Sequence, residues 1–167
     1  MRKKVRIAGI VRESIVDGPG IRFVVFAQGC PHHCDGCHNP STHDFNGGNL
    51  VAVDAIINEM KKNPLLDGIT LSGGEPFEQP EVFGELAERA RELGYHVMAY
   101  TGYTYEKLLA KKDEQRLRLL ENTDLLVDGK FEMEKKSLLL KFKGSKNQRI
   151  IDVKKSLLLK NTVLSEV

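Results

Sequence analysis

The sequence has only three cysteines, no apolar run long enough to cross a membrane and no large excess of either charge. Its 25 Lys and Arg residues against 23 Asp and Glu residues leave a net charge of +2. The basic residues are scattered, so nothing in the charge pattern requires nucleic acid. Near the N-terminus the longest apolar run is residues 23–27, far short of the ~20 residues of a membrane-spanning helix.

The N-terminus begins with basic residues, as a secretory signal does, but Arg6 and Arg12 interrupt the apolar stretch that follows. Such a stretch cannot serve as the apolar core of a signal peptide. We therefore expect a cytoplasmic protein without a membrane segment. The 41% hydrophobic and 29% charged residues are ordinary for a soluble globular protein. A length of 167 residues favours one domain over residues 1–167.

Strand-like and helix-like segments alternate along the chain. Runs of β-branched, aromatic and other apolar residues predict strands over 21–28, 68–71, 95–101, 125–127 and 149–153. Helical spacing of apolar residues predicts helices over 53–62, 80–93, 105–110 and 114–121. Strands separated by helices imply parallel βαβ units with right-handed crossovers.

The expected fold class is therefore α/β. A full eight-stranded barrel takes ~250 residues, so we expect a partial, open (β/α) barrel of about four to six parallel strands with outer helices. A small doubly wound sheet fits the same pattern. In both folds ligands bind at the carboxyl ends of the strands. Three loops are predicted at those ends: the cysteine loop, residues 72–76 and residues 128–130.

The cysteines lie in the segment CPHHCDGC, at Cys30, Cys34 and Cys37. An odd, clustered set is a poor disulfide framework, and in a reducing compartment it indicates metal or redox chemistry. A [4Fe–4S] cluster normally takes one thiolate for each of its four irons. Three cysteines would leave one iron open, which a reactive metal site requires.

Two other interpretations remain open at this point. A structural zinc site of the Cys₃His type could draw its fourth ligand from one of four nearby histidines, at positions 32, 33, 38 and 43. The protein would then be a non-catalytic, zinc-stabilised binding module, although no second pair of ligands follows. Alternatively, Cys34 and Cys37 have the spacing of a redox thiol pair, which would leave Cys30 without a role.

The motifs together resemble a known superfamily. The Cys-x₃-Cys-x₂-Cys segment after a strand, with Gly73-Gly74-Glu75-Pro76 after a later strand, is similar to the radical S-adenosylmethionine (SAM) enzymes. The segment DGPGIR at 17–22 resembles the activases of glycyl radical enzymes. Three later segments resemble the activating proteins of anaerobic (class III) ribonucleotide reductases: TGYT at 101–104, VDGKF at 127–131 and GSKNQR at 144–149.

The resemblance implies a partial barrel of the radical SAM type, one [4Fe–4S] cluster and SAM. It implies that the cluster is held by three thiolates, those of Cys30, Cys34 and Cys37. Gly73 and Gly74 would let the backbone approach the methionyl amine, because a Cβ would obstruct it. A Gly74→Val variant would then keep its cluster and lose SAM affinity.

Further contacts follow from the same resemblance. The adenosine side of SAM would be lined by Gly36, Cys37 and His38. Asp128 and Lys130, at a strand end, would hold the ribose or the methionyl carboxylate.

The resemblance also implies a reaction and its partners. An electron donor such as flavodoxin reduces the cluster, and SAM is cleaved to methionine and a 5′-deoxyadenosyl radical. That radical takes a Cα hydrogen from a glycine of the anaerobic ribonucleoside-triphosphate reductase, in its glycyl radical subunit. The alternative partner within the superfamily is another glycyl radical enzyme, of the formate-lyase type.

Overall fold

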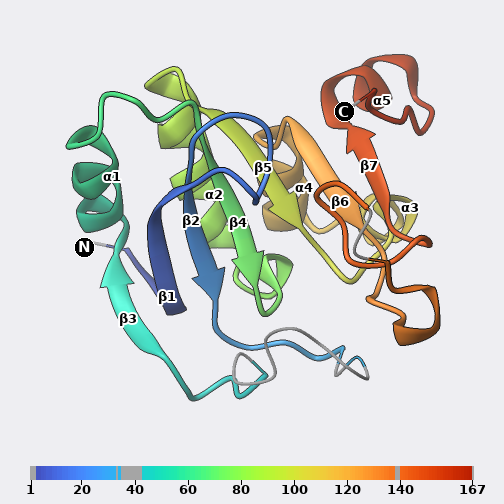
Figure 1. Cartoon of the computed structure of the whole chain (residues 1–167), viewed down its shortest axis with the longest axis horizontal. Helices are drawn as coiled ribbons and strands as arrows, with labels where there is room; N and C mark the ends of the chain where they lie inside the picture. Colours follow the sequence, from blue (N-terminus) through green and yellow to red (C-terminus); the bar gives the residue numbers. More distant parts are fainter. Residues whose placement is uncertain (1–2, 33, 35–42, 138–139, 167) are drawn as a thin grey trace.

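The computed structural model describes residues 3–32, 34, 43–137 and 140–166, which form one seven-stranded sheet in the order β3-β1-β2-β4-β5-β6-β7 (Figure 1). The strands are β1 (Lys4–Ser14), β2 (Arg22–Ala27), β3 (Asn49–Ala52), β4 (Gly68–Gly73), β5 (His96–Tyr100), β6 (Leu125–Asp128) and β7 (Arg149–Asp152). The helices are α1 (Val53–Lys61), α2 (Pro80–Glu92), α3 (Tyr105–Ala110), α4 (Glu114–Glu121) and α5 (Val153–Leu159).

The four central strands confirm the α/β prediction. Strands β2, β4, β5 and β6 are parallel neighbours, and α1, α2, α3 and α4 fall between them in the chain. The expectation that all strands are parallel is wrong for β1 and β7, which run opposite to the four central strands. Strand β1, which was not predicted, pairs antiparallel with β2 and β3. Strand β7 was predicted but runs antiparallel to β6, because the chain returns to it without a crossover helix.

All five helices pack against the same face of the sheet. Buried residues from each of them join the main core, among them Ile57, Phe83, Leu108, Leu120 and Val153. This arrangement excludes the doubly wound sheet, which has helices on both faces. The described sheet is not closed, since β3 and β7 are its edges. None of the helices described is long and apolar enough to span a bilayer.

Local sequence signals set the helix boundaries. The Asp113 carboxylate accepts hydrogen bonds from the backbone N–H groups of Gln115 and Arg116 and so caps the start of α4. Pro80 occupies the first turn of α2, where its missing N–H costs nothing. Gly94 follows this helix with φ of +90°, the left-handed conformation that commonly ends a helix.

Side chains alternate in direction along each strand, so the sheet has one face covered by helices and one open face. On β2, Phe23, Val25 and Ala27 belong to the core beneath the helices, so the residues between them point to the open face. There a second apolar cluster is formed by four buried residues from three strands: Met98, Leu125, Val127 and Ile150. The open face is therefore a partly apolar floor, and the candidate site is built on it.

Candidate functional site

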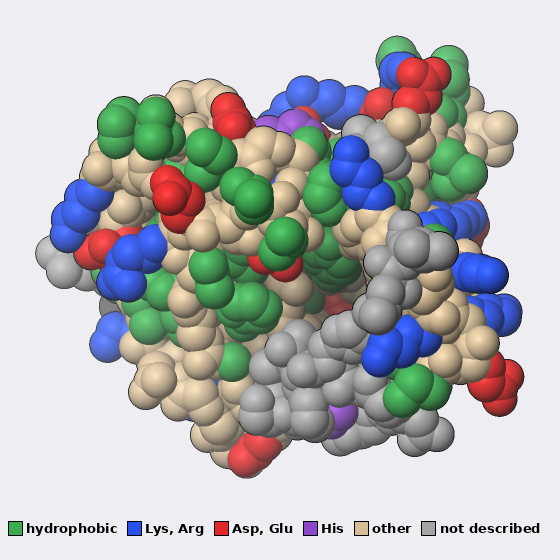
Figure 2. Space-filling model, in the orientation of Figure 1, with side chains coloured by type: hydrophobic (Ala, Val, Ile, Leu, Met, Phe, Trp, Pro, Cys, Tyr) green, Lys and Arg blue, Asp and Glu red, His purple; other side chains and the backbone are tan. Residues whose placement is uncertain are grey.

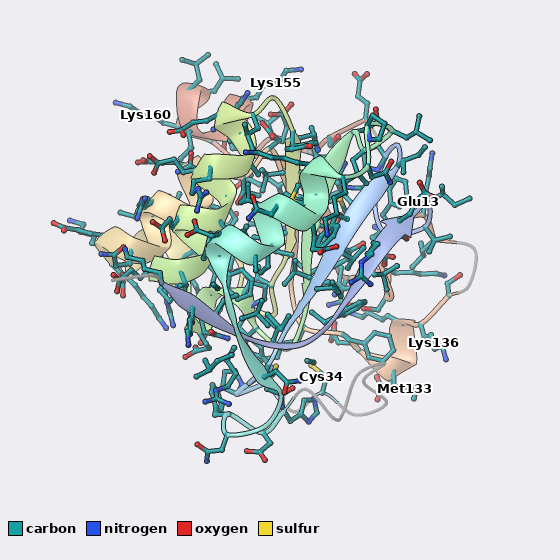
Figure 3. The ribbon with its side chains drawn as sticks, turned by 90° about the vertical axis from the view of Figure 1, so that its left-hand side faces the viewer. Glu13, Cys34, Met133, Lys136, Lys155 and Lys160 are labelled. Carbon is teal, nitrogen blue, oxygen red and sulfur yellow. The ribbon has the colours of Figure 1, made fainter. Side chains whose placement is uncertain are left out.

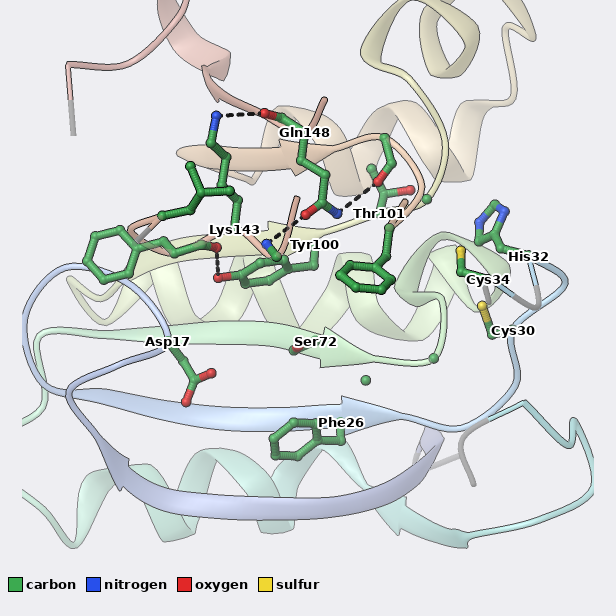
Figure 4. Close-up of a pocket in the computed structure, with 18 of the residues that line it drawn as sticks. Asp17, Phe26, Cys30, His32, Cys34, Ser72, Tyr100, Thr101, Lys143 and Gln148 are labelled. Carbon is green, nitrogen blue, oxygen red and sulfur yellow. Dashed lines mark hydrogen bonds between the residues drawn. The ribbon is translucent and has the colours of Figure 1, made fainter. Parts of the chain in front are cut away.

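A cavity of about 370 Å³ lies on the open face of the sheet. Phe26, Ser72 and Tyr100 line it from three adjacent parallel strands, and described residues between β6 and β7, among them Lys143 and Gln148, line its opposite side (Figure 4). The face in Figure 2 is hollowed near its centre. The volume is in the range of small-molecule sites, and the position agrees with the rule that ligands bind at carboxyl ends of parallel strands.

Two cysteines stand at one end of this cavity. Cys30 follows β2 and is 8% exposed, and Cys34 lies beside it; both line the cavity (Figure 4). Figure 3 shows Cys34 at one end of the molecule, opposite Lys155 and Lys160. The structure thus brings these two predicted ligands together. Gly36, Cys37 and His38 lie outside the described residues.

Gly73, the last residue of β4, and Gly74 after it also line the cavity, but the position that a Cβ would take on each is next to backbone atoms. A Cβ on Gly74 would lie 2.5 Å from the Gly29 carbonyl oxygen and 2.9 Å from that of Ala27. A Cβ on Gly73 would lie 2.7 Å from the Ala27 nitrogen. The Cβ positions thus face backbone, and the two glycines let this loop pack on the segment that leads into the cysteines. Their expected contact with the methionyl group of SAM stays a prediction.

Glu75 is a fully buried carboxylate between the loops that follow β2, β4 and β5. The sequence indicated it only as part of the Gly-Gly-Glu-Pro motif. Its Oε1 accepts hydrogen bonds from the Gly102 backbone N–H at 2.7 Å and the Thr101 hydroxyl at 3.0 Å. Its Oε2 accepts one from the Phe77 backbone N–H at 3.1 Å. The imidazole of His32 completes the set, with Nε2 2.5 Å from Oε1.

The turn at 17–20 lies at the far end of the cavity, where Val16 and Asp17 line it. Arg22 holds this turn from beneath and is fully buried. Its guanidinium donates to the Pro19 carbonyl at 2.8 Å and to the Thr70 hydroxyl at 2.7 Å, and that hydroxyl donates to the Asp17 carbonyl. Burial lowers the pKa of Arg22 to about 10, so it remains a cation at neutral pH.

The segment between β6 and β7 closes the cavity on its other side. The Tyr100 hydroxyl donates to the Phe142 carbonyl, and burial raises the pKa of Tyr100, so the phenol stays a donor. Gln148 accepts from the Gly144 N–H at 2.8 Å and donates to the Gly129 carbonyl at 3.0 Å. Gln148 also lines the cavity, and the Asn147 amide donates to the Lys130 carbonyl at 2.8 Å, so both residues hold this segment together.

Asp128 and Lys130 are placed differently from what was expected. The carboxylate of Asp128 is 1% exposed and is held by Arg149, at 3.0 Å from its Nε, and by the Tyr105 backbone N–H at 2.8 Å. Lys130 is exposed. Of the turn 128–130, only Gly129 lines the cavity. Asp128 therefore joins β6, β7 and α3 and does not face the cavity.

We expect Arg149→Met to lower the free energy of unfolding by about 3 kcal/mol, the low end for breaking a buried ion pair. The Asp128 carboxylate is 1% exposed and would lose its guanidinium partner, whereas the Arg149 side chain is 33% exposed and already partly screened by water. Arg118→Met is the matched control, because Arg118 is equally exposed and pairs with an exposed Glu88. It should cost less than about 1 kcal/mol. Urea titrations of metal-free protein test this, and equal losses in the two variants would contradict it.

The cysteine end of the cavity suits an iron–sulfur cluster. Two thiols on one wall supply the soft ligands that such clusters take, and the glycine loops on the adjoining walls bring backbone close without side chains in between. Among the described residues no group of three His, Cys, Asp or Glu side chains forms a metal site. The third cysteine of the motif lies outside them. His32, one candidate for zinc, has its Nε2 turned to Glu75.

Known proteins resemble this sequence along most of its length. Residues 16–151 match the family described as 4Fe-4S single cluster domain. The anaerobic ribonucleoside-triphosphate reductase-activating protein of Escherichia coli (strain K12) is 36% identical over 143 residues, 80% of this chain and 90% of that protein. The protein of the same name from Enterobacteria phage T4 is 33% identical over 142 residues, covering 81% and 86%.

A relative whose name gives a different target enzyme also matches this sequence. The pyruvate formate-lyase-activating enzyme of Clostridium pasteurianum is 38% identical over 117 residues. That match covers 65% of this chain but 49% of the Clostridium protein. The two names differ in the enzyme that is activated, so the choice between the two partners rests on the extent of the match.

Proposed function

The chain belongs to the 4Fe-4S single cluster domain family and to the anaerobic ribonucleoside-triphosphate reductase-activating proteins, and we propose that it generates a glycyl radical on such a reductase. The reaction is a reductive cleavage of SAM at a [4Fe–4S] cluster. The seven-stranded sheet, with four parallel strands and helices on one face only, is consistent with a partial, open barrel of the radical SAM type.

One observation carries the proposal. Cys30 and Cys34 line the same end of a cavity that is also lined by Gly73, Gly74 and Gly102. Thiols at the end of an α/β cavity, next to loops without side chains, provide ligands for a cluster and space for a small molecule beside it. The family match covers this whole region, residues 16–151.

Cys30, Cys34 and Cys37 would hold the cluster and leave one iron open to SAM. When bound, the cluster supplies the single electron that breaks the C5′–S bond of SAM. Gly73 and Gly74 would place backbone groups against the methionyl end, and the family resemblance assigns Gly36 and His38 to the adenosine side. Asp128 and Lys130 are not part of this proposal, because neither lines the cavity.

An external one-electron donor such as flavodoxin supplies the electron, and SAM gives methionine and a 5′-deoxyadenosyl radical. That radical takes the Cα hydrogen of a glycine in the partner, which leaves 5′-deoxyadenosine and a glycyl radical. The reductase is preferred as partner because the matches to its activating proteins cover 90% and 86% of those proteins, against 49% for the formate-lyase activase.

We expect an anaerobic mixture of reduced protein, SAM and the anaerobic reductase of the same organism to show a glycyl radical by electron paramagnetic resonance. The formate-lyase-type enzyme of that organism, treated identically, should show none. Deuterium placed at the Cα of the target glycine should appear in 5′-deoxyadenosine.

The control omits SAM and should leave the reductase without a radical. A radical on the lyase alone would overturn the choice of partner but not the SAM chemistry. No radical on either enzyme, with SAM still cleaved, would reject the activase function.

A further inference from the structure

Glu75 connects three loops that the sequence places far apart. It follows the glycines at the end of β4, and its carboxylate accepts hydrogen bonds from Thr101 and Gly102 in the loop after β5. The third loop is the cysteine segment, which contributes His32. A buried carboxylate is costly unless several donors satisfy it, so the position of each loop depends on this one group.

The ring of His32 is enclosed on several sides. Its side chain is 6% exposed, and Nε2 lies 2.5 Å from the Glu75 Oε1, so the ring donates an N–H to an acceptor-only carboxylate. The Tyr103 ring meets it edge-on, with the centroids 4.6 Å apart. A Cβ on Gly102 would overlap the imidazole. The side chain therefore has little freedom to turn elsewhere.

His32 also lies between two predicted cluster ligands. It is two residues from Cys30 and two from Cys34, and all three side chains line the cavity (Figure 4). The backbone just before it is anchored as well, since the Glu75 N–H donates to the Gly29 carbonyl at 2.8 Å. Glu75 thus holds the cysteine segment by its backbone at Gly29 and by its side chain at His32.

From this geometry we infer that His32 is a positioning residue. It acts through Glu75 to hold the segment that carries Cys30 and Cys34 against two loops, the one at Gly74 and the one at Gly102. The thiols of Cys30 and Cys34 are then placed before any cluster arrives, and the segment loses less conformational freedom on binding it. This inference rests on the proposed cluster site. It assigns His32 no iron bond and no proton transfer; the residue acts only by its hydrogen bond and its packing.

Two variants at position 32 separate the hydrogen bond from the packing. His32→Leu fills similar space without a donor, whereas His32→Gln keeps an N–H donor of similar reach. Loss of an outer partner typically costs 10- to 100-fold in metal affinity. We expect reconstituted His32→Leu to release iron to a chelator at least about 10-fold faster than the wild type. His32→Gln should restore most of that retention.

Thr101→Val is the matched control, because it removes a donor to the same Glu75 oxygen but none from the cysteine segment. Its iron release should stay close to that of the wild type. The second measurement uses metal-free protein, in which the Cys30 backbone N–H donates to the His43 carbonyl at 3.3 Å. Hydrogen exchange in the peptide that carries Cys30 should be faster in His32→Leu, and exchange in β4 and β5 should be unchanged.

Iron release at the wild-type rate from His32→Leu would overturn the inference. So would equal losses in His32→Leu and His32→Gln, or an equal loss in Thr101→Val. If His32→Leu fails to fold, the inference is still tested by the comparison of His32→Gln with Thr101→Val and by the exchange data on metal-free protein. Failure of the proposed function is distinguishable, because the wild type itself would then take up no cluster, while the exchange result would stand.

Discussion

Cys30→Ala protein, reconstituted without oxygen, is expected to hold no stable cluster and to release no 5′-deoxyadenosine from SAM. The wild type should be brown, with about four irons and four sulfides per chain. Cys30 is 8% exposed and lines the cavity beside Cys34. Losing it leaves two thiolates at most, too few for a cluster that needs three and must keep one iron open. Iron and sulfide analysis, absorption spectra and assay of 5′-deoxyadenosine measure the effect.

The control is Thr123→Ala. Thr123 is fully buried and donates to the Leu119 carbonyl at 2.8 Å, but it does not line the cavity. This variant should be somewhat less stable and still hold a full cluster. Metal-free Cys30→Ala should remain folded, which distinguishes loss of a ligand from loss of the fold. A full cluster with activity in Cys30→Ala would contradict the ligand assignment, and so would stoichiometric zinc in freshly isolated active protein.

The parts of the fold that the sequence predicted are those with local signals. Helix α4 was expected over 114–121 and spans Glu114–Glu121, because Asp113 caps it and its apolar residues recur at helical spacing. Strand β2 was expected from a run of β-branched and aromatic residues. Strand β1 was missed because charged residues interrupt its apolar ones, and its stability comes from pairing with β2 and β3.

In the candidate site, as in the fold, the features with a local sequence pattern were predictable and the long-range contacts were not. The spacing of the cysteines identified a metal site, but the contact between His32 and Glu75 joins residues 43 positions apart, and no local pattern indicates it. The orientation of Asp128 could not be predicted, because Leu125, Leu126 and Val127 before it are all apolar and do not show which face each side chain takes. Val127 belongs to the cluster on the open face and Leu126 to the core beneath the helices. Alternation therefore turns Asp128, the next residue, toward the helices and away from the cavity.

Gly74→Val is expected to lose both the cluster and SAM binding. The carbonyl oxygens of Gly29 and Ala27 lie where the new side chain would begin, 2.5 Å and 2.9 Å from its Cβ. These atoms are backbone and cannot move aside as a side chain could. The Gly74 N–H also donates to Ala27 at 2.8 Å, so the two segments separate together. Overpacking of this kind costs about 3 kcal/mol, and the displaced segment carries Cys30.

The control for this variant is Gly9→Ala on β1, where a Cβ would meet nothing within 4 Å and φ is not positive. It should match the wild type in stability, iron content and SAM affinity. If Gly74 were needed only to leave room for the methionyl group, Gly74→Val would keep four irons and lose SAM binding alone. Iron content of the reconstituted variant therefore decides between the two explanations. The packing in this structure predicts its loss, because the glycine loop and the cysteine segment are held together by the contact that valine would break.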